Sequence, residues 1–237
     1  MNSKIHKNIL IWFLTAVSFV SSNPKVGLEI GLGLYGPKMS GFDDNVQVPF
    51  PTKNIFTRNL LLNWGLYYEF FSNARIGYYS NTSVEVGKLD LQESKPAFQR
   101  YIRYRMLPVE TFFRWKPRIE LNFTLAPVWG RAEMIMDTKP SDKHEDWNEL
   151  LNSFGDSNPL TEMAGTDQMV NNWLGYSGQI GIRYYLSSRL GIDFKFGFMN
   201  NKYKNDNWRV QRNKVIGPKI DIKKLPVFSV KANYAIR

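Results

Sequence analysis

Apolar and polar residues alternate along most of the chain beyond residue 24. In KVGLEIGLGLY, which begins at Lys25, every second residue is valine, leucine or isoleucine, with glycine or glutamate between them. The same period of two recurs in NLLLNWGLYYEF, ARIGYYSNTSVEV, IELNFTLAPVWG, GQIGIRYYL, LGIDFKFGF and FSVKANYAIR. Such a period predicts β-strands that have one apolar face and one polar face.

The stretch from 101 to 115 predicts an eighth strand, interrupted at Pro108. We expect a register shift there, because proline cannot donate to a strand ladder and is often found at a bulge. Before the proline the apolar face would carry Ile102, Tyr104 and Met106, and after it Val109, Thr111, Phe113 and Trp115.

The connections between these strands alternate in length. Short turns are expected at FSNAR, WKPR and LSSR, and long loops at roughly 37–56, 87–100, 136–171 and 200–218. Short turns on one side and long loops on the other are typical of outer-membrane barrels. The sequence therefore predicts an all-β fold: an eight-stranded antiparallel up-and-down transmembrane β-barrel with short periplasmic turns and long extracellular loops.

The residue types on the two faces decide which of them points inward. A soluble lipocalin-like cup, the alternative eight-stranded barrel, would enclose its apolar face. Here the apolar face carries Trp, Phe, Tyr, Leu and Ile, which are too bulky for a narrow cylinder, whereas glycines and charges of both signs can interdigitate and pair inside one. We expect a structural charge network in the lumen, made of Glu29, Glu69, Arg75, Glu85, Arg103, Arg105, Glu110, Arg114, Glu120, Arg183, Asp193 and Lys195.

Aromatic residues at the strand ends are expected to form two interfacial girdles around the lipid-facing surface. The periplasmic girdle would contain Phe70, Trp115, Tyr184 and Tyr234, and the extracellular girdle Tyr104, Trp129, Tyr176 and Phe198.

The first 22 residues have the composition of a secretory signal peptide. MNSKIHKN carries two lysines, ILIWFLTAVSFV is free of charge, and small residues follow before Asn23. This order predicts export, a signal peptide at 1–22 and a barrel domain at 23–237, located in the outer membrane. The chain has no cysteine, so no disulfide framework is expected.

The glycine pattern of GLGLYG, residues 31–36, also fits a dinucleotide-binding fingerprint. That fingerprint requires a helix directly after it, and the sequence that follows, PKMSGFDDNVQVPFPT, does not predict one. We interpret Gly27, Gly31 and Gly33 instead as lumen positions that make room for bulky neighbours such as Tyr35, Tyr67 or Tyr79.

Three stretches resemble small outer-membrane barrel proteins of the Bacteroidota type, including PorT-like proteins, with OmpA/OmpX-type barrels as architectural relatives. They are KVGLEIGLGLYG, YRMLPVETFFRWKPRIELNFTLAPVWG and GYSGQIGIRYYLSSRLGIDFKFGF. The chain departs from the pattern at its end, since such barrels usually finish on an aromatic residue and this sequence ends Ile236-Arg237.

No catalytic constellation or cofactor motif is predicted. The one histidine beyond the leader, His144, lies in KHEDWNELLNSFG, which predicts a short loop helix with a solvated histidine. Beside it, Ser141 and Asp146 would complete a hydrolase triad only in a geometry that a loop helix does not favour. The loop acids lack an EF-hand spacing, so no metal site is expected.

The sequence predicts a non-enzymatic protein with a structural, adhesion or secretion-complex accessory role. Its expected partners are outer-membrane lipid and, through loops 136–171 and 200–218, lipopolysaccharide or a protein. No nucleic-acid binding is expected, because the formal net charge of +10 is spread along the chain. The chain is expected to be a monomer, and a soluble ligand-binding barrel and a narrow pore are the alternatives. Within loop 136–171, Trp147, Leu150, Leu151 and Phe154 have near-helical spacing and would either pack on the barrel rim or anchor a partner, and we favour the rim.

Overall fold

The fold was determined as a computed structural model of the chain. The structure describes residues 25–34, 39–40, 60–88, 97–136, 143–157, 160, 168–211, 213–220 and 222–236. The predicted signal peptide at 1–22 and most of the predicted loop at 37–56 lie outside these residues.

A closed antiparallel barrel is formed by eight wall strands, each paired with its neighbours in the chain, and the last pairs with the first. The fold-class prediction is thereby confirmed. The wall consists of β1 (Lys25–Leu34), β3 (Leu60–Phe71), β4 (Ala74–Lys88), β5 (Ala97–Met106) continued by β6 (Val109–Lys116), β7 (Ile119–Met136), β8 (Gln168–Tyr185), β9 (Leu190–Asn201) and β13 (Leu225–Ile236).

The predicted bulge at Pro108 is wrong. β5 and β6 are two parts of one wall strand, and the register against β7 is the same on both sides of the proline, with Met106 opposite Val128 and Val109 opposite Leu125. The proline lacks an N–H but its carbonyl still accepts a hydrogen bond from Gly77 N at 2.9 Å. The ladder is therefore interrupted while the alternation of faces continues unbroken.

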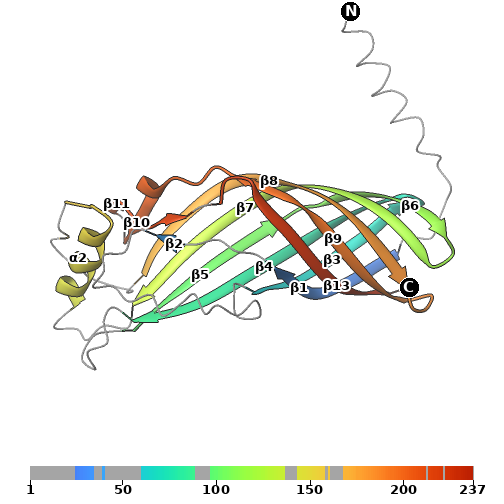
Figure 1. The fold of residues 1–237 in the computed structure, drawn as a ribbon, viewed down its shortest axis with the longest axis horizontal. Coiled ribbons are helices and arrows are strands. Elements are labelled where there is room, and N and C mark those ends of the chain that lie inside the picture. Colours follow the sequence, from blue (N-terminus) through green and yellow to red (C-terminus); the bar gives the residue numbers. More distant parts are fainter. Residues whose placement is uncertain are drawn as a thin grey trace, which may run out of the picture.

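The two ends of the barrel differ (Figure 1). The turn end carries the short connections at 72–73, 117–118 and 186–189, and β13 finishes there. The cap end carries the long connections, which contain β2 (Met39–Ser40), α2 (Lys143–Ser153), η1 (Asn205–Asn207), β10 (Trp208–Val210), β11 (Asn213–Val215) and β12 (Lys219–Ile220). Among the described residues no helix is long and apolar enough to cross a membrane.

The wall of the turn half is apolar outside and polar inside. On β3, for example, the side chain of Leu62 is 63% exposed, whereas its neighbour Asn63 is 6% exposed. The same alternation on the other strands exposes Ile30, Leu66, Phe113, Phe123, Ile180, Ile182, Phe194, Phe196 and Phe228. This polarity is opposite to that of a lipocalin and is the arrangement found in transmembrane barrels.

The polarity inverts at the cap end on β5, β7 and β8. Ile102, Tyr104 and Met106 are buried inside the barrel, while Arg103 and Arg105 face outward. β7 and β8 have 18 residues each, against about 9–11 for a tilted transmembrane strand, so they are long enough to extend beyond the apolar band. Their outer ends therefore follow the rule for a soluble barrel, with a hydrophobic core inside.

This inversion corrects two predictions from the sequence. Tyr104 was expected in the extracellular aromatic girdle, but it is fully buried in the core of the cap end. Arg103 and Arg105 were expected in the lumen, but they share the outer face with Trp129, since Arg105 lies opposite Trp129 in the register. The sequence interpretation assigned every apolar face to lipid, whereas the face that is buried changes where the wall leaves the apolar band.

Candidate functional site

The lumen of the turn half holds a network of buried ion pairs. The four acids are Glu29 of β1, Glu110 of β6, Glu120 of β7 and Asp193 of β9, and the four bases are Arg75 of β4, Arg183 of β8, Lys195 of β9 and Lys231 of β13. Equal numbers of opposite charges leave the network neutral. Because a buried charge is costly unless it is paired, this balance is what allows the lumen to be filled with ions.

Arg183 is the centre of one half of the network. Its Nη2 donates to Glu29 Oε1 at 2.5 Å and to Asp193 Oδ2 at 2.7 Å. Lys231 Nζ donates to the second oxygen of Glu29 at 3.4 Å, and Asn122 Nδ2 donates to Asp193 Oδ1 at 3.2 Å. Each carboxylate thus has more than one donor.

Glu110 is the centre of the other half. Its carboxylate accepts hydrogen bonds from Arg75 and Lys195, and from Thr124 Oγ1 at 2.8 Å. Arg75 also donates to Glu120, which accepts a further bond from the Tyr185 hydroxyl at 2.7 Å. The halves are joined by Lys195, whose Nζ lies 3.6 Å from Asp193 Oδ2.

Tyrosine rings separate the cations in this network. The Tyr67 ring lies 5.4 Å from the guanidinium carbons of both Arg75 and Arg183, and the Tyr79 ring lies 3.8 Å from Lys231 Nζ. A Cβ at Gly27 would lie only 2.0 Å from the Tyr67 ring, so the glycine in KVGLEIG provides the space that the ring occupies, as predicted.

The structure brings together most of the predicted lumen residues. Glu29, Arg75, Glu110, Glu120, Arg183, Asp193 and Lys195 are in the network, and Glu69 is buried next to it on β3. Arg114 lies at the turn-end mouth, half-exposed, with its Nε 4.0 Å from Glu120. Glu85 belongs to β4, but its side chain lies outside the described residues.

Lys231 and Tyr185 were not among the predicted network residues. Lys231 lies on the polar face of FSVKANYAIR, so the period of two alone could have included it. Tyr185 lies two residues after Arg183 on the same face of β8, but it follows another tyrosine, so the residue types of this pair do not show which one faces the lumen.

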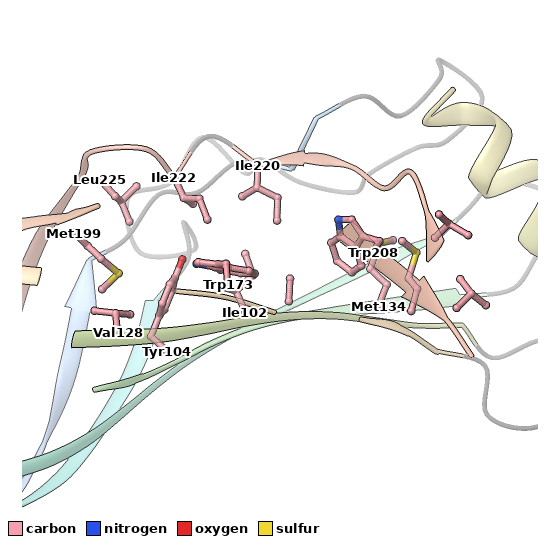
Figure 2. Packing of buried hydrophobic residues seen from close by; sticks show 14 of the residues in the cluster. Ile102, Tyr104, Val128, Met134, Trp173, Met199, Trp208, Ile220, Ile222 and Leu225 are labelled. Atoms are coloured by element: carbon pink, nitrogen blue, oxygen red, sulfur yellow. The ribbon is translucent and has the colours of Figure 1, made fainter. Parts of the chain in front are cut away.

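The lumen of the cap end is filled by hydrophobic side chains instead (Figure 2). Loop four, residues 202–224, supplies Ile220 and Ile222, which lie across the interior from the wall residue Tyr104, and Trp208, which lies beside Met134 of the wall. From loop three, residues 137–167, Trp147, Leu150 and Leu151 of α2 belong to the same buried cluster, and Phe154 packs against it. The predicted loop helix and its packing on the barrel are thereby confirmed.

Hydrogen bonds hold loop four on the barrel. Asn201 Nδ2 donates to Ile222 O at 3.1 Å, and Asn171 Nδ2 donates to Lys204 O at 2.7 Å. Trp208 Nε1 donates to the Tyr203 hydroxyl at 2.7 Å, and that hydroxyl donates to Pro218 O. Burial raises the pKa of Tyr203 above its ordinary value, although the hydrogen bond from Trp208 lowers it in part.

Loop four also contacts loop three and loop one, the connection between β1 and β3. β2 of loop one pairs with β12 of loop four, and Asp156 Oδ2 of loop three accepts a hydrogen bond from Ile216 N of loop four at 2.7 Å. We call these packed segments the cap. Among the described residues, no group of histidine, cysteine and carboxylate side chains has the geometry of a metal site.

Comparisons with known proteins find likeness in structure but not in sequence. No protein-family model and no curated protein matches the chain. Among solved structures, Ail, the attachment invasion locus protein of Yersinia pestis, in complex with the heparin analogue sucrose octasulfate, is 12% identical and covers 91% of this chain and 100% of its own, with a TM-score of 0.48.

Two further structures are similar over the same span. The outer membrane protein OprG from Pseudomonas aeruginosa is 12% identical, covering 90% of this chain and 96% of its own, with a TM-score of 0.49. Neisserial surface protein A is 8% identical, covering 90% and 97%, with a TM-score of 0.47. None of these matches tests the predicted kinship with PorT-like proteins. The chain is therefore similar to small outer-membrane barrels, and its function has to be argued from its own residues.

Proposed function

We propose that this protein is a non-enzymatic barrel of the outer membrane, which crosses the lipid with its turn half and presents its cap outside the cell. One observation carries the proposal: a surface of large exposed apolar side chains surrounds a buried, charge-balanced lumen. In water, that surface would be a large exposed hydrophobic patch, whereas in a bilayer it is matched to its surroundings.

The role that we propose for the cap is recognition, in adhesion or as an accessory of a secretion complex. The barrel strands are occupied by lipid contact and internal pairing, so recognition is left to the loops that the scaffold holds in place. Loop four exposes a basic surface made of Lys202, Lys204, Arg209, Lys214, Lys219, Lys223 and Lys224. A partner with an acidic surface is complementary to it.

No enzymatic role is proposed, because every charged residue of the lumen network is engaged in an ion pair within it. The ionised groups of the network are each bound to a partner of opposite charge, and the lumen around them is filled by Tyr67, Tyr79 and Phe112. The side chain of His144, the one histidine beyond the leader, lies outside the described residues.

Membrane fractionation combined with a heat-modifiability gel tests the proposal. A folded membrane barrel is expected in the outer-membrane fraction, and it should migrate differently on the gel before and after boiling. Recovery of the folded protein in the soluble periplasmic fraction would contradict the membrane assignment and favour the ligand-binding cup.

A further inference from the structure

Three arginines gather on the outer face of the wall, at the cap end of β5 and β7. Arg103 and Arg131 lie directly opposite each other in the register, and Arg105 lies opposite Trp129, one outward position nearer the turn end. The one acid beside them is Glu133, whose Oε2 lies 3.5 Å from Arg131 Nε. Among the described residues neither Arg103 nor Arg105 has an ion-pair partner, so the group carries an excess of two positive charges.

This arrangement is unfavourable by itself. Like charges directly opposite each other on neighbouring strands repel, and the repulsion is stronger beside lipid than in water. An outward arginine is costly in the middle of a bilayer and nearly neutral at its interface. Three of them together therefore indicate a position at the interface and an anion that compensates their charge.

The surroundings of the arginines are half polar and half apolar. They line a groove of about 620 Å³, together with Trp129, Glu133 and Leu174. Trp129 is 42% exposed and lies opposite Arg105, and Leu174 is 58% exposed and lies opposite Trp129 on the next strand. The cap-end wall of the groove is polar, since Asn172 is exposed there. A ligand that fills this groove needs an anionic group beside an apolar chain.

We propose that this groove binds the phosphorylated headgroup of a membrane lipid. The guanidinium groups of Arg103, Arg105 and Arg131 would bind phosphate oxygens, for which arginine has a matching planar geometry. The acyl chains would run past Leu174 along the apolar band. This inference rests on the proposed function, which places the cap end at the outer leaflet, where the lipid available is phosphorylated lipopolysaccharide.

Binding of lipopolysaccharide to the purified full chain in detergent tests the proposal. The probes are lipopolysaccharide, the same material after chemical removal of its phosphate groups, and inorganic pyrophosphate. The variant is Arg103→Gln/Arg105→Gln/Arg131→Gln. Its matched control is Lys116→Gln/Arg118→Gln/Arg189→Gln, which removes the same charge from exposed residues at the turn end. A heat-modifiability gel verifies that each variant is folded.

We expect the arginine variant to lose affinity for lipopolysaccharide by about tenfold or more, because one charge-assisted hydrogen bond already corresponds to about that factor. The turn-end control should bind as the unaltered chain does, and dephosphorylated lipopolysaccharide should bind weakly to both. Equal binding by the arginine variant would overturn the proposal, as would equal binding of the dephosphorylated lipid. Pyrophosphate binding as tight as that of the lipid would assign the groove to a free anion and overturn it too.

These failures are distinguishable from failure of the proposed function. If the chain fractionates with the outer membrane but binds lipopolysaccharide independently of its phosphate groups, only the proposed headgroup site in the groove is contradicted. If the chain is recovered in the periplasm as a folded soluble protein, both the headgroup site and the proposed membrane function are contradicted.

Discussion

Phe194 shows which face of the barrel wall is exposed and which is buried. It lies in the middle of β9 with its side chain 45% exposed, while its neighbours Asp193 and Lys195 are buried in the charge network. Successive residues of β9 therefore meet an ionic, an apolar and again an ionic environment, because successive side chains of a strand point to opposite faces.

The substitution Phe194→Arg should destabilise the barrel, lowering its free energy of unfolding in lipid by about 2–4 kcal/mol, because it places a charge near the middle of the bilayer. Urea unfolding in lipid vesicles, followed by heat-modifiability, measures the change. The control is Gln168→Arg at the cap end of β8, where a cost of about 0–1 kcal/mol is expected. Equal tolerance of arginine at both positions would mean that the wall does not face lipid.

Arg183 is the residue on which the lumen network depends most. The substitution Arg183→Gln leaves Glu29 and Asp193 buried with fewer donors, and breaking a buried pair in this way typically costs about 3–5 kcal/mol. Arg189→Gln, in the exposed turn between β8 and β9, is the control and should be nearly neutral. Both are measured by urea unfolding of the refolded protein.

A double-mutant cycle separates the ion pair from a simple packing effect. Adding Asp193→Asn to Arg183→Gln should cost less than the sum of the two single changes, since the second substitution removes the charge that the first left unpaired. Strict additivity would mean that Arg183 acts by its size alone and that the network does not stabilise the barrel.

At the scale of elements, loop four closes the cap end. Its buried residues Trp208, Ile220 and Ile222 are separated along the chain by β11 and exposed lysines, yet they meet over one core (Figure 2). β10 extends the wall beside β8 and β12 pairs with β2, so Trp208 and Ile220 are each presented by a short strand, and Ile222 follows β12. The loop is thus a folded part of the barrel.

Trp208→Ala should release loop four while the wall strands stay folded. Removal of a buried tryptophan costs about 3–5 kcal/mol, and most of this cost falls on the few contacts that hold the loop. Limited trypsin digestion should cleave at Lys214 or Lys219 faster than in the unaltered chain, with the barrel still heat-modifiable. Lys202→Ala, which changes an exposed side chain of the same loop, should leave the cleavage rate unchanged. Equal cleavage of the two variants would contradict the packed loop.

At the scale of the whole molecule, two different fillings occupy the barrel one above the other. Ion pairs and tyrosines fill the turn half, and the hydrophobic core of the cap fills the other half. An eight-stranded barrel has an interior just wide enough for side chains. Both fillings together argue against the narrow pore.

The purified protein should give little or no steady conductance in planar lipid bilayers. Trp208→Ala/Ile220→Ala/Ile222→Ala, which empties the cap core, should also be closed, because the ion-pair network lies below it. Large, stable, ohmic channels in the unaltered protein would reject the filled lumen. Channels that appear in the triple variant alone would mean that the cap is the only barrier.

The strands of the barrel and the contents of its turn-half lumen could largely be predicted from the sequence. The alternation in LGIDFKFGF and IELNFTLAPVWG determined the strands, the closed topology and the inward direction of Asp193, Lys195 and Glu120, because lipid and a narrow lumen impose opposite demands on adjacent residues. The helix in KHEDWNELLNSFG and the contact of its apolar side with the barrel were also predicted from its spacing.

What the tertiary structure alone decided is where the apolar band ends. The period of two gives two faces but does not say which is buried, and on β5 the apolar residues Ile102, Tyr104 and Met106 turn inward because the cap of loops three and four covers them. Arg103 and Arg105 are outside for the same reason. Burial at these positions is produced by segments as distant in the sequence as Ile222, which is 120 residues after Ile102, so no local pattern contains it.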